Sequence, residues 1–466
     1  MTRPGGRHTQ PVQHEDGQRN VVVHRDPPTA HGHQHGAGPV PIGAAARWVV
    51  VTVLSLAVAA VAIGLAVLWP SAAGEHPIPI QFRSADGGAM RTDTATVVAQ
   101  ARAECQNPMT GVAVDAPQSL GVAPVVDGPC YATTVRLDSG ADKGRFVLLQ
   151  VPTNRAQSGD GPGQPRLDPA TADNPAPGQP TLRVDNTIRV SAVPGIDGSL
   201  RYSFFDFARG PAIIVWAILF LVAIVVVAAW KGLRSIIGLV FAFAVLGVFT
   251  LPSILSGHSP VAVAITSSAL ILIVVLYLAH GVSMRTSAAL LGTLVSLLFA
   301  GVLSWLAIRT MDIAGLSGDQ AMNLQLYSGT ISMTGLLLAG FIIGALGVLN
   351  DVTITQASAT FELAAAGEPS RLATFRAAMR VGRDHIASTV YTLVFAYAGS
   401  ALPLLLLFSV AAQPFGSLVT TDQVAIELAR AFVGGIAIAL SVPLTTAVAA
   451  ALVTISPRDG AVPAGR

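Results

Sequence analysis

Asp351 follows directly on a Gly-rich apolar segment that is long enough to cross a membrane. The chain has no Asp or Glu from Pro211 to Met311, so an acid at this position stands out. A charge at membrane depth is costly and usually faces a protein interior or a water-filled path. We therefore take Asp351 as the first candidate for carrying a proton or an ion. The alternative is that the helix has already left the membrane there.

Polar residues continue from Asp351 at helical spacing. Thr355, Ser358 and Glu362 stand four, seven and eleven residues further on, which places them on one face of a helix. Such a stripe can line an aqueous vestibule or coordinate a cation, with Thr355 and the adjacent Gln356 as ligands. For Glu362 the simpler interpretation, a side chain turned to water, is favoured.

A basic segment comes next along the chain. A helix break at 367–369 precedes Ser370, a typical N-cap residue. Arginines, among them Arg380 and Arg383, then fall on one side of the predicted helix and apolar residues on the other. This pattern indicates an amphipathic helix at the membrane surface, although arginines that merely hold a loop inside give the same pattern. Asp384 can pair with Arg380 four residues earlier.

Prolines and glycines mark the apolar segments on either side. Pro403 and Pro443 predict interruptions in the last two segments, where freed carbonyl groups can bind ions in transporters. Prolines are also common in inert membrane helices, so the functional interpretation stays open. Gly340 and Gly344 form a small-xxx-small pair, for which close helix packing is favoured over a direct role with substrate.

The elements that must position these residues are membrane helices. The chain is 52% hydrophobic and 12% charged, about half the charge of a typical globular protein. About 20 apolar residues span a bilayer, which predicts a multi-pass α-helical membrane protein of about eight transmembrane helices. The predicted spans are 48–69, 212–229, 233–251, 261–279, 287–308, 331–350, 386–412 and 431–455.

The first span is expected to stay in place as a signal anchor. A long N-terminal segment precedes it and the residues after it form a poor cleavage site, which disfavours a cleaved signal peptide. Lys and Arg gather in loops on the same side as both termini. The positive-inside rule therefore predicts a cell (cytoplasmic) membrane protein whose N- and C-termini are cytoplasmic, with residues 70–210 extracytoplasmic.

The predicted organisation has five parts. A disordered cytoplasmic tail (1–46) leads into the anchor (47–69) and a β-rich extracytoplasmic domain (70–210), before a seven-helix core (211–456) and a short tail (457–466). The segments 94–102, 131–137, 145–151, 181–193 and 199–207 are expected to be strands of a small OB-like barrel between helices 1 and 2. A Gly- and Asp-rich turn at 138–144 indicates a hairpin.

The two cysteines, Cys105 and Cys130, are expected to form a disulfide on the outer side, with two unpaired thiols as the alternative. The histidines at 31, 33 and 35 could hold a metal, but a solvated tail is favoured, and neither metal nor cofactor is predicted. The net charge of +2 and the lack of a basic patch argue against nucleic-acid binding.

Several segments of the chain form a pattern that is known from other proteins. They are 347–354, 361–363, 382–386 and 392–400, with 139–144, 205–209, 231–235 and 251–252 further out. Together they resemble the YibE/F-like membrane protein family over about residues 90–455. The resemblance implies a multi-pass membrane protein of unassigned biochemistry. This chain departs from the family pattern at Asp185-Asn186 and at Tyr391, where the family tends to have Gly-Asp and Asn.

The favoured function is a transporter or permease-like protein for an ion or small solute, with Asp351 as carrier. Thr355 and Gln356 would be neighbouring ligands, and Glu362 with Arg383–Asp384 would form an inner gate. The alternative is a scaffold or sensor whose outer domain binds an envelope partner. An enzyme is not expected, because no nucleophile–base pair or phosphate-binding loop is recognisable. The expected partners are the bilayer and a small ion or solute, with a homo-oligomer left open.

Overall fold

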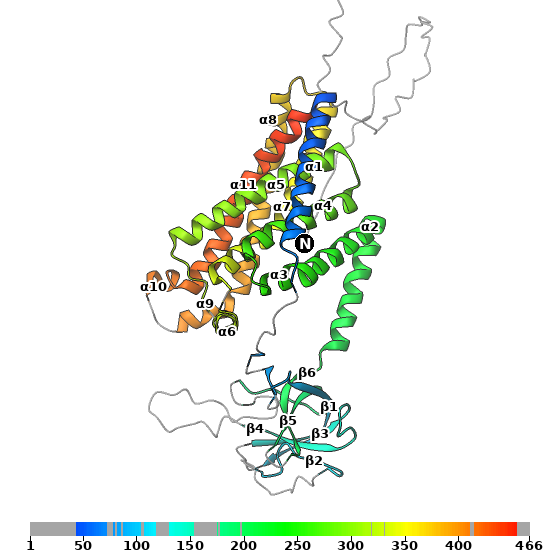
Figure 1. Ribbon diagram of the computed structural model, residues 1–466, viewed down its shortest axis with the longest axis vertical. Helices are drawn as coiled ribbons and strands as arrows, with labels where there is room; N and C mark the ends of the chain where they lie inside the picture. Colours follow the sequence, from blue (N-terminus) through cyan, green and yellow to red (C-terminus); the bar gives the residue numbers. More distant parts are fainter. Residues whose placement is uncertain are drawn as a thin grey trace, which may run out of the picture. The chain divides into compact units, whose positions relative to one another are not determined.

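The computed structural model describes residues 43–71, 78–79, 82–84, 87–103, 107–117, 130–152, 175, 178–195, 198–317, 319–329, 331–410 and 414–453. Figure 1 shows the helices and strands in these ranges. Residues 1–42 of the predicted tail 1–46, the predicted tail 457–466, the His cluster and Cys105 lie outside the described residues, and the last residues of the first tail already belong to α1, which begins at Ala44.

Six described helices are long and apolar enough to cross a membrane, or seven if one bent pair counts as a single span. The protein is thus a largely helical membrane protein, while the predicted count of about eight spans is not confirmed. The six are α1 (Ala44–Val67), Gly210–Leu255, α4 (Pro260–His280), α5 (Met284–Thr310), α7 (Met333–Ala365) and α11 (Asp422–Leu452). The bent pair is α8 (Arg371–Ser400) with α9 (Leu402–Val410), and the short helices are α6 (Asp319–Tyr327) and α10 (Phe415–Val419).

The two spans predicted at 212–229 and 233–251 are not separated by a loop. Helix α2 (Gly210–Val245) runs through both and continues into the π-helical turn η3 (Leu246–Thr250) and α3 (Leu251–Leu255). It bends sharply at Ala229, whose φ of 48° and ψ of −131° are not helical (Figure 1). A Cβ on Gly232 would lie 2.6 Å from the Ile224 carbonyl oxygen, so glycine allows the two arms to fold back at this point.

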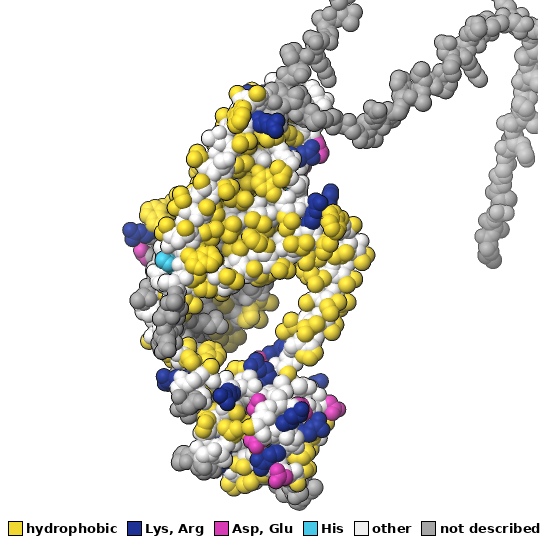
Figure 2. All heavy atoms as spheres, turned by 45° about the vertical axis from the view of Figure 1, so that its right-hand side comes forward, with side chains coloured by type: hydrophobic (Ala, Val, Ile, Leu, Met, Phe, Trp, Pro, Cys, Tyr) yellow, Lys and Arg dark blue, Asp and Glu magenta, His cyan; other side chains and the backbone are white. Residues whose placement is uncertain are grey.

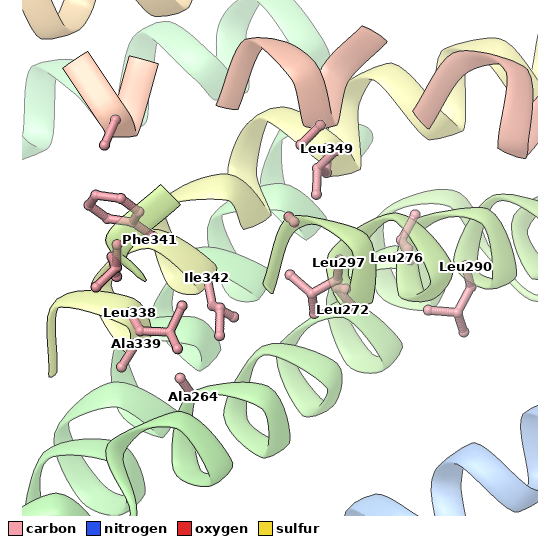
Figure 3. Packing of buried hydrophobic residues seen from close by; sticks show 14 of the residues in the cluster. Ala264, Leu272, Leu276, Leu290, Leu297, Leu338, Ala339, Phe341, Ile342 and Leu349 are labelled. Atoms are coloured by element: carbon pink, nitrogen blue, oxygen red, sulfur yellow. The ribbon is translucent and has the colours of Figure 1, made fainter. Parts of the chain in front are cut away.

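Helix α7 lies at the centre of the bundle and packs against α4, α5, α8 and α11. Apolar side chains fill the contacts, as Figure 3 shows for Ile342 and Leu349 of α7 with Leu272 of α4 and Leu297 of α5. Over the outside of the helices Figure 2 shows mostly hydrophobic side chains, as a lipid-facing surface requires. Three of these helices begin at a serine whose side chain accepts a backbone N–H three residues on: Ser283, Ser332 and the predicted cap Ser370.

The two prolines behave differently. Pro403 stands at the beginning of α9, where α8 and α9 meet at a bend of 56°. Pro443 lies inside α11, which runs on without a break from Asp422 to Leu452, so the predicted interruption there is wrong. One proline removes a single N–H donor, and packing against α5, α7 and α8 holds the rest of α11 in place.

The β-rich part is an antiparallel six-stranded half-barrel. Its strand order is β2-β4-β3-β1-β5-β6, and its core is formed by inward residues such as Val97, Val135 and Ile188. The predicted hairpin at 138–144 joins β3 to β4, with Gly140 and Gly144 at positive φ. The strands are β1 (Arg91–Ala103), β2 (Ala113–Val114), β3 (Cys130–Leu137), β4 (Phe146–Pro152), β5 (Thr187–Pro194) and β6 (Leu200–Phe207).

The two edges of this sheet approach each other. Val112, next to β2, forms a bridge with Arg201 of β6, and the backbone N–H of Tyr202 donates to the Gly111 carbonyl at 2.8 Å. Gly111 has a φ of 78°, and a Cβ there would lie 2.7 Å from the Tyr202 carbonyl oxygen. Only glycine fits this closure without strain.

Candidate functional site

Most of the predicted site residues lie on α7, and contacts with α1 define their levels. Near the end of α7, Phe361 shares a buried cluster with Val50 of α1. At its beginning, Met333 belongs to a cluster that includes Leu68, just past the other end of α1. Asp351 lies between these levels, ten residues before Phe361. That separation is about 15 Å along the axis at 1.5 Å per residue.

The side chain of Asp351 is exposed and makes no ion pair with any residue that the structure describes. Thr355, one turn further on, is also exposed, and its hydroxyl donates to the Asp351 backbone carbonyl at 2.8 Å. The two residues therefore share one open face of α7. The hydroxyl hydrogen of Thr355 is already donated to its own helix, so the oxygen of this hydroxyl is the atom that can bind a cation.

Three glycines extend the same face toward the beginning of α7. Gly340, Gly344 and Gly347 are exposed and stand at helical spacing from Asp351. A Cβ on Gly340 or Gly347 would have no atom within 4 Å, and one on Gly344 would lie 3.7 Å from the Tyr397 hydroxyl. The close packing predicted for Gly340 and Gly344 is therefore not made within the described chain. The three glycines form a strip of exposed α7 surface without side chains on the face that carries Asp351, which we call the glycine lane.

Gln356 points away from this face and is 3% exposed. Its Nε2 donates to the Ala378 carbonyl of α8 at 2.9 Å and to Thr446 Oγ1 of α11 at 2.6 Å. A Cβ on Gly382 of α8 would lie 2.9 Å from Gln356 Oε1 and 2.5 Å from a Val442 methyl. Gln356 thus ties three helices together and does not join Asp351 in one site, contrary to the predicted grouping.

Buried hydroxyl groups on neighbouring positions of α5, α7 and α11 form, together with Gln356, what we call the polar layer. Thr353 of α7 is hydrogen-bonded to Thr293 of α5, and both are fully buried. Thr445 Oγ1 is buried with no hydrogen-bond partner among the described residues, and a Cβ on Gly292 would lie 2.4 Å from it. Neither Thr293 nor Thr353 was predicted as a site residue, although a polar residue in each of two apolar segments was a visible signal.

The residues predicted to form an inner gate do not meet. Glu362 forms an ion pair at 3.3 Å with Arg285, at the beginning of α5, with side chains 68% and 45% exposed. Arg383 and Asp384 are exposed, and within the described ranges neither forms an ion pair, so the expected Arg380–Asp384 pair is absent there. An exposed pair such as Arg285–Glu362 contributes about 0–1 kcal/mol.

A second charged cluster lies near the beginning of α11. Arg430 is bonded to Glu427 at 3.0 Å, and its guanidinium lies 5.4 Å from the Phe341 ring and 5.6 Å from the Tyr397 ring. Partly buried cation–π contacts of this kind contribute about 1–2 kcal/mol.

The half-barrel has a groove of about 580 Å³ whose lining includes Tyr202, Phe204, Asp206, Phe207 and Arg209. Asp206 accepts two bonds from Arg209 Nη1, at 2.7 and 2.8 Å, and these with the Phe207 backbone N–H lower the pKa of Asp206. Phe204 and Phe207 stack edge to face.

Two further residues of the half-barrel, Tyr202 and Cys130, have side chains that are largely buried. Burial, and then the 2.8 Å bond to Asp142, raises the pKa of Tyr202. Cys130 is buried at the beginning of β3. Cys130 is disulfide-bonded, as expected, while Cys105, the other cysteine of the chain, lies outside the described residues.

Comparison with known proteins gives one match. The family model described as YibE/F-like protein matches residues 216–455, just over half of the chain. The match covers all the helices from α4 to α11 and the site residues on α7 and α8. No curated protein and no solved structure matches the chain.

Proposed function

The chain belongs to the YibE/F-like family, and we propose that it moves a small ion or proton across the cell membrane, with Asp351 as the carrying group. The observation that carries the proposal is an exposed carboxylate on α7, a helix long and apolar enough to cross a membrane, with no cationic partner among the described residues. Ionisable residues inside the membrane are rare and mark ion pathways and proton relays.

The tryptophans of α1 support a position of Asp351 at membrane depth. Trp48 and Trp69 are exposed near the two ends of α1, about 32 Å apart along a helix, which is the thickness of the hydrocarbon core. Trp is enriched at both membrane interfaces. Asp351 lies between the levels of Val50 and Leu68, within this interval. We infer that Asp351 faces the hydrocarbon region rather than the cytoplasm.

The glycine lane and the polar layer support this function in different ways. We propose that water or a solvated ion approaches Asp351 along Gly340, Gly344 and Gly347, because these exposed positions carry no side chains. Gln356, Thr353 and their partners fix the opposite side of α7 against α5, α8 and α11. A carrier on a rigid helix keeps its position through repeated binding and release. Thr355 is the second ligand that we assign.

The test is proton and ion flux into liposomes that contain the purified protein. Asp351→Asn keeps the shape of the side chain and removes its charge, so we expect flux to fall to the level of empty liposomes. Asp312→Asn is the matched control, because Asp312 is an exposed acid in the turn after α5, and flux should be unchanged. Wild-type flux in Asp351→Asn would refute the carrier role.

We propose a topology with both termini and the α7–α8 turn in the cytoplasm and the half-barrel outside. Its support is the Lys and Arg content of the predicted inside loops. The order of the five long strands, β4-β3-β1-β5-β6, agrees with an OB-like barrel. We propose no enzymatic activity. Cysteine labelling from outside at an introduced Ser139→Cys, with an introduced Ser370→Cys as the inside control, tests the topology.

A scaffold or sensor is the second candidate, and the half-barrel groove favours it. Aromatic side chains beside the Asp206–Arg209 pair offer both stacking and charge to an envelope partner. Deletion of residues 75–200 separates the candidates. A transporter core should retain part of its flux without the half-barrel, whereas a protein that acts through the outer domain should lose its cellular function and show no flux in either form.

A further inference from the structure

A groove of about 780 Å³ runs along α1 where α1 faces α4 and α5. We call it the α1 groove. It lies apart from Asp351 and from the glycine lane of α7. Its lining residues are Arg47, Val50, Val51, Leu54, Ser55, Val58, Ala59 and Ala62 of α1 together with Tyr277, Val282, Ser283, Met284 and Ser287.

One end of the α1 groove is polar and favours an anion. Arg47 is exposed, and its side chain makes no ion pair with any described residue. The N-terminus of α5 lies at the same end, because Met284 is its first residue. A helix N-terminus carries a partial positive charge. Tyr277 and Ser287 add hydroxyl groups 2.9 Å apart, and no Asp or Glu lines the groove.

The rest of the α1 groove is mostly apolar, and the length of the whole groove matches the thickness of one bilayer leaflet. From Arg47 to Ala62 the groove follows α1 for fifteen residues, or about 22 Å at 1.5 Å per residue. Half of a bilayer with its headgroups measures about 20–22 Å. Trp48, beside Arg47, is 71% exposed and marks the interface at this end.

From these features we propose that the α1 groove binds one anionic phospholipid. Its phosphate lies between Arg47 and the first turn of α5, and an acyl chain follows Val51, Val58 and Ala62. Basic pockets between membrane helices are known to recognise anionic headgroups in this way. The lipid fills the space between α1 and the bundle, so it also ties the first helix of the chain to the core.

The experiment measures lipid binding to the purified full-length protein by native mass spectrometry, with dioleoyl phosphatidylglycerol and dioleoyl phosphatidylcholine as probes. We expect the wild type to bind the anionic lipid about fivefold more tightly, the effect of one basic residue at a membrane surface. Arg47→Gln should remove this preference and leave phosphatidylcholine binding unchanged, and Arg47→Lys should restore most of it. Ala59→Phe should fill the groove and weaken binding of both lipids.

Arg234→Gln is the matched control, since Arg234 lies over the Trp230 ring on α2 and does not line the groove. Its lipid preference should equal that of the wild type. Equal binding of the two lipids by the wild type, or the same effect from Arg47→Gln and Arg234→Gln, would overturn the proposal. Displacement of the lipid by free glycerol phosphate would show a site for the phosphate alone and would also overturn it. These outcomes do not depend on whether the protein transports an ion.

Discussion

Replacement of Gln356 by leucine tests whether this residue is a structural clamp or a ligand of the transported ion. The change removes two interhelical hydrogen bonds and keeps the volume of the side chain. Such bonds average about 0.6 kcal/mol each in membrane proteins. Thr446 still donates to the Val442 carbonyl at 2.6 Å, and the Ala378 carbonyl stays within α8, so neither partner is left unpaired. The free energy of unfolding should therefore fall by about 1–2 kcal/mol.

The assay is equilibrium unfolding of the purified protein in detergent, together with liposome flux. Thr355→Val is the matched control for stability, because Thr355 is exposed and donates only within its own helix. It should change the free energy of unfolding by less than about 0.5 kcal/mol. For Gln356→Leu we expect reduced stability with flux per folded molecule retained. Full stability with abolished flux would refute the clamp and return Gln356 to the ion site beside Asp351.

Three further predictions concern particular contacts. Gly382→Ala should lower the free energy of unfolding by about 1–3 kcal/mol, because its Cβ would lie 2.5 Å from a Val442 methyl; Gly399→Ala, with open space around it, is the control in the same unfolding experiment. Gly111→Ala should destabilise the half-barrel, because the added Cβ meets the Tyr202 carbonyl at a positive φ. Limited proteolysis should then cleave the outer domain of this variant faster than that of the wild type. Gly87→Ala is the control, also at positive φ but without a neighbour, and its outer domain should be cleaved more slowly than that of Gly111→Ala. The raised pKa of Tyr202 means that the folded state keeps the phenol proton when the unfolded state loses it, so this residue's stabilisation is complete below pH 10 and is lost as the pH rises above it. Proteolysis of the outer domain should accelerate above pH 10 in the wild type and less so in Tyr202→Phe; identical pH profiles would contradict the assignment.

The helices and turns that depend on local sequence could be predicted. Apolar length gave the approximate position of each long helix, and Ser370 was identifiable as an N-cap because its hydroxyl bonds a backbone group only three residues away. The hairpin at 138–144 was predictable for the same reason, since Gly140 and Gly144 meet a local need for positive φ. A break next to Ala229 was predicted as well, between the spans 212–229 and 233–251, but its form was not, because alanine carries no signal for a non-helical φ and the kink depends on Gly232 meeting Ile224.

The assembly of the candidate site was harder to predict. Residue spacing along a helix tells which side chains share a face, but not which neighbouring helix that face contacts. The spacing of Asp351 and Thr355 placed them correctly on one face, yet nothing in it tells which face meets α8 and α11. Gln356 is one residue from Thr355 in sequence and points to a different neighbour. The partner of Glu362 is Arg285, 77 residues earlier, and no local pattern links the two.

The contact between α1 and α11 has a consequence for biosynthesis. Val50 packs against Ala449, Leu452 and Val453, which are the last residues of the described chain. At a synthesis rate of about 5–20 residues per second, about 20–80 seconds pass between the synthesis of α1 and the synthesis of these residues. During that time α1 can contact α4 and α5, which are made earlier, but it lacks its neighbours on α11. The cluster around Val50 is therefore completed late, and a chain that stops before α11 should leave this end of α1 without its C-terminal neighbours.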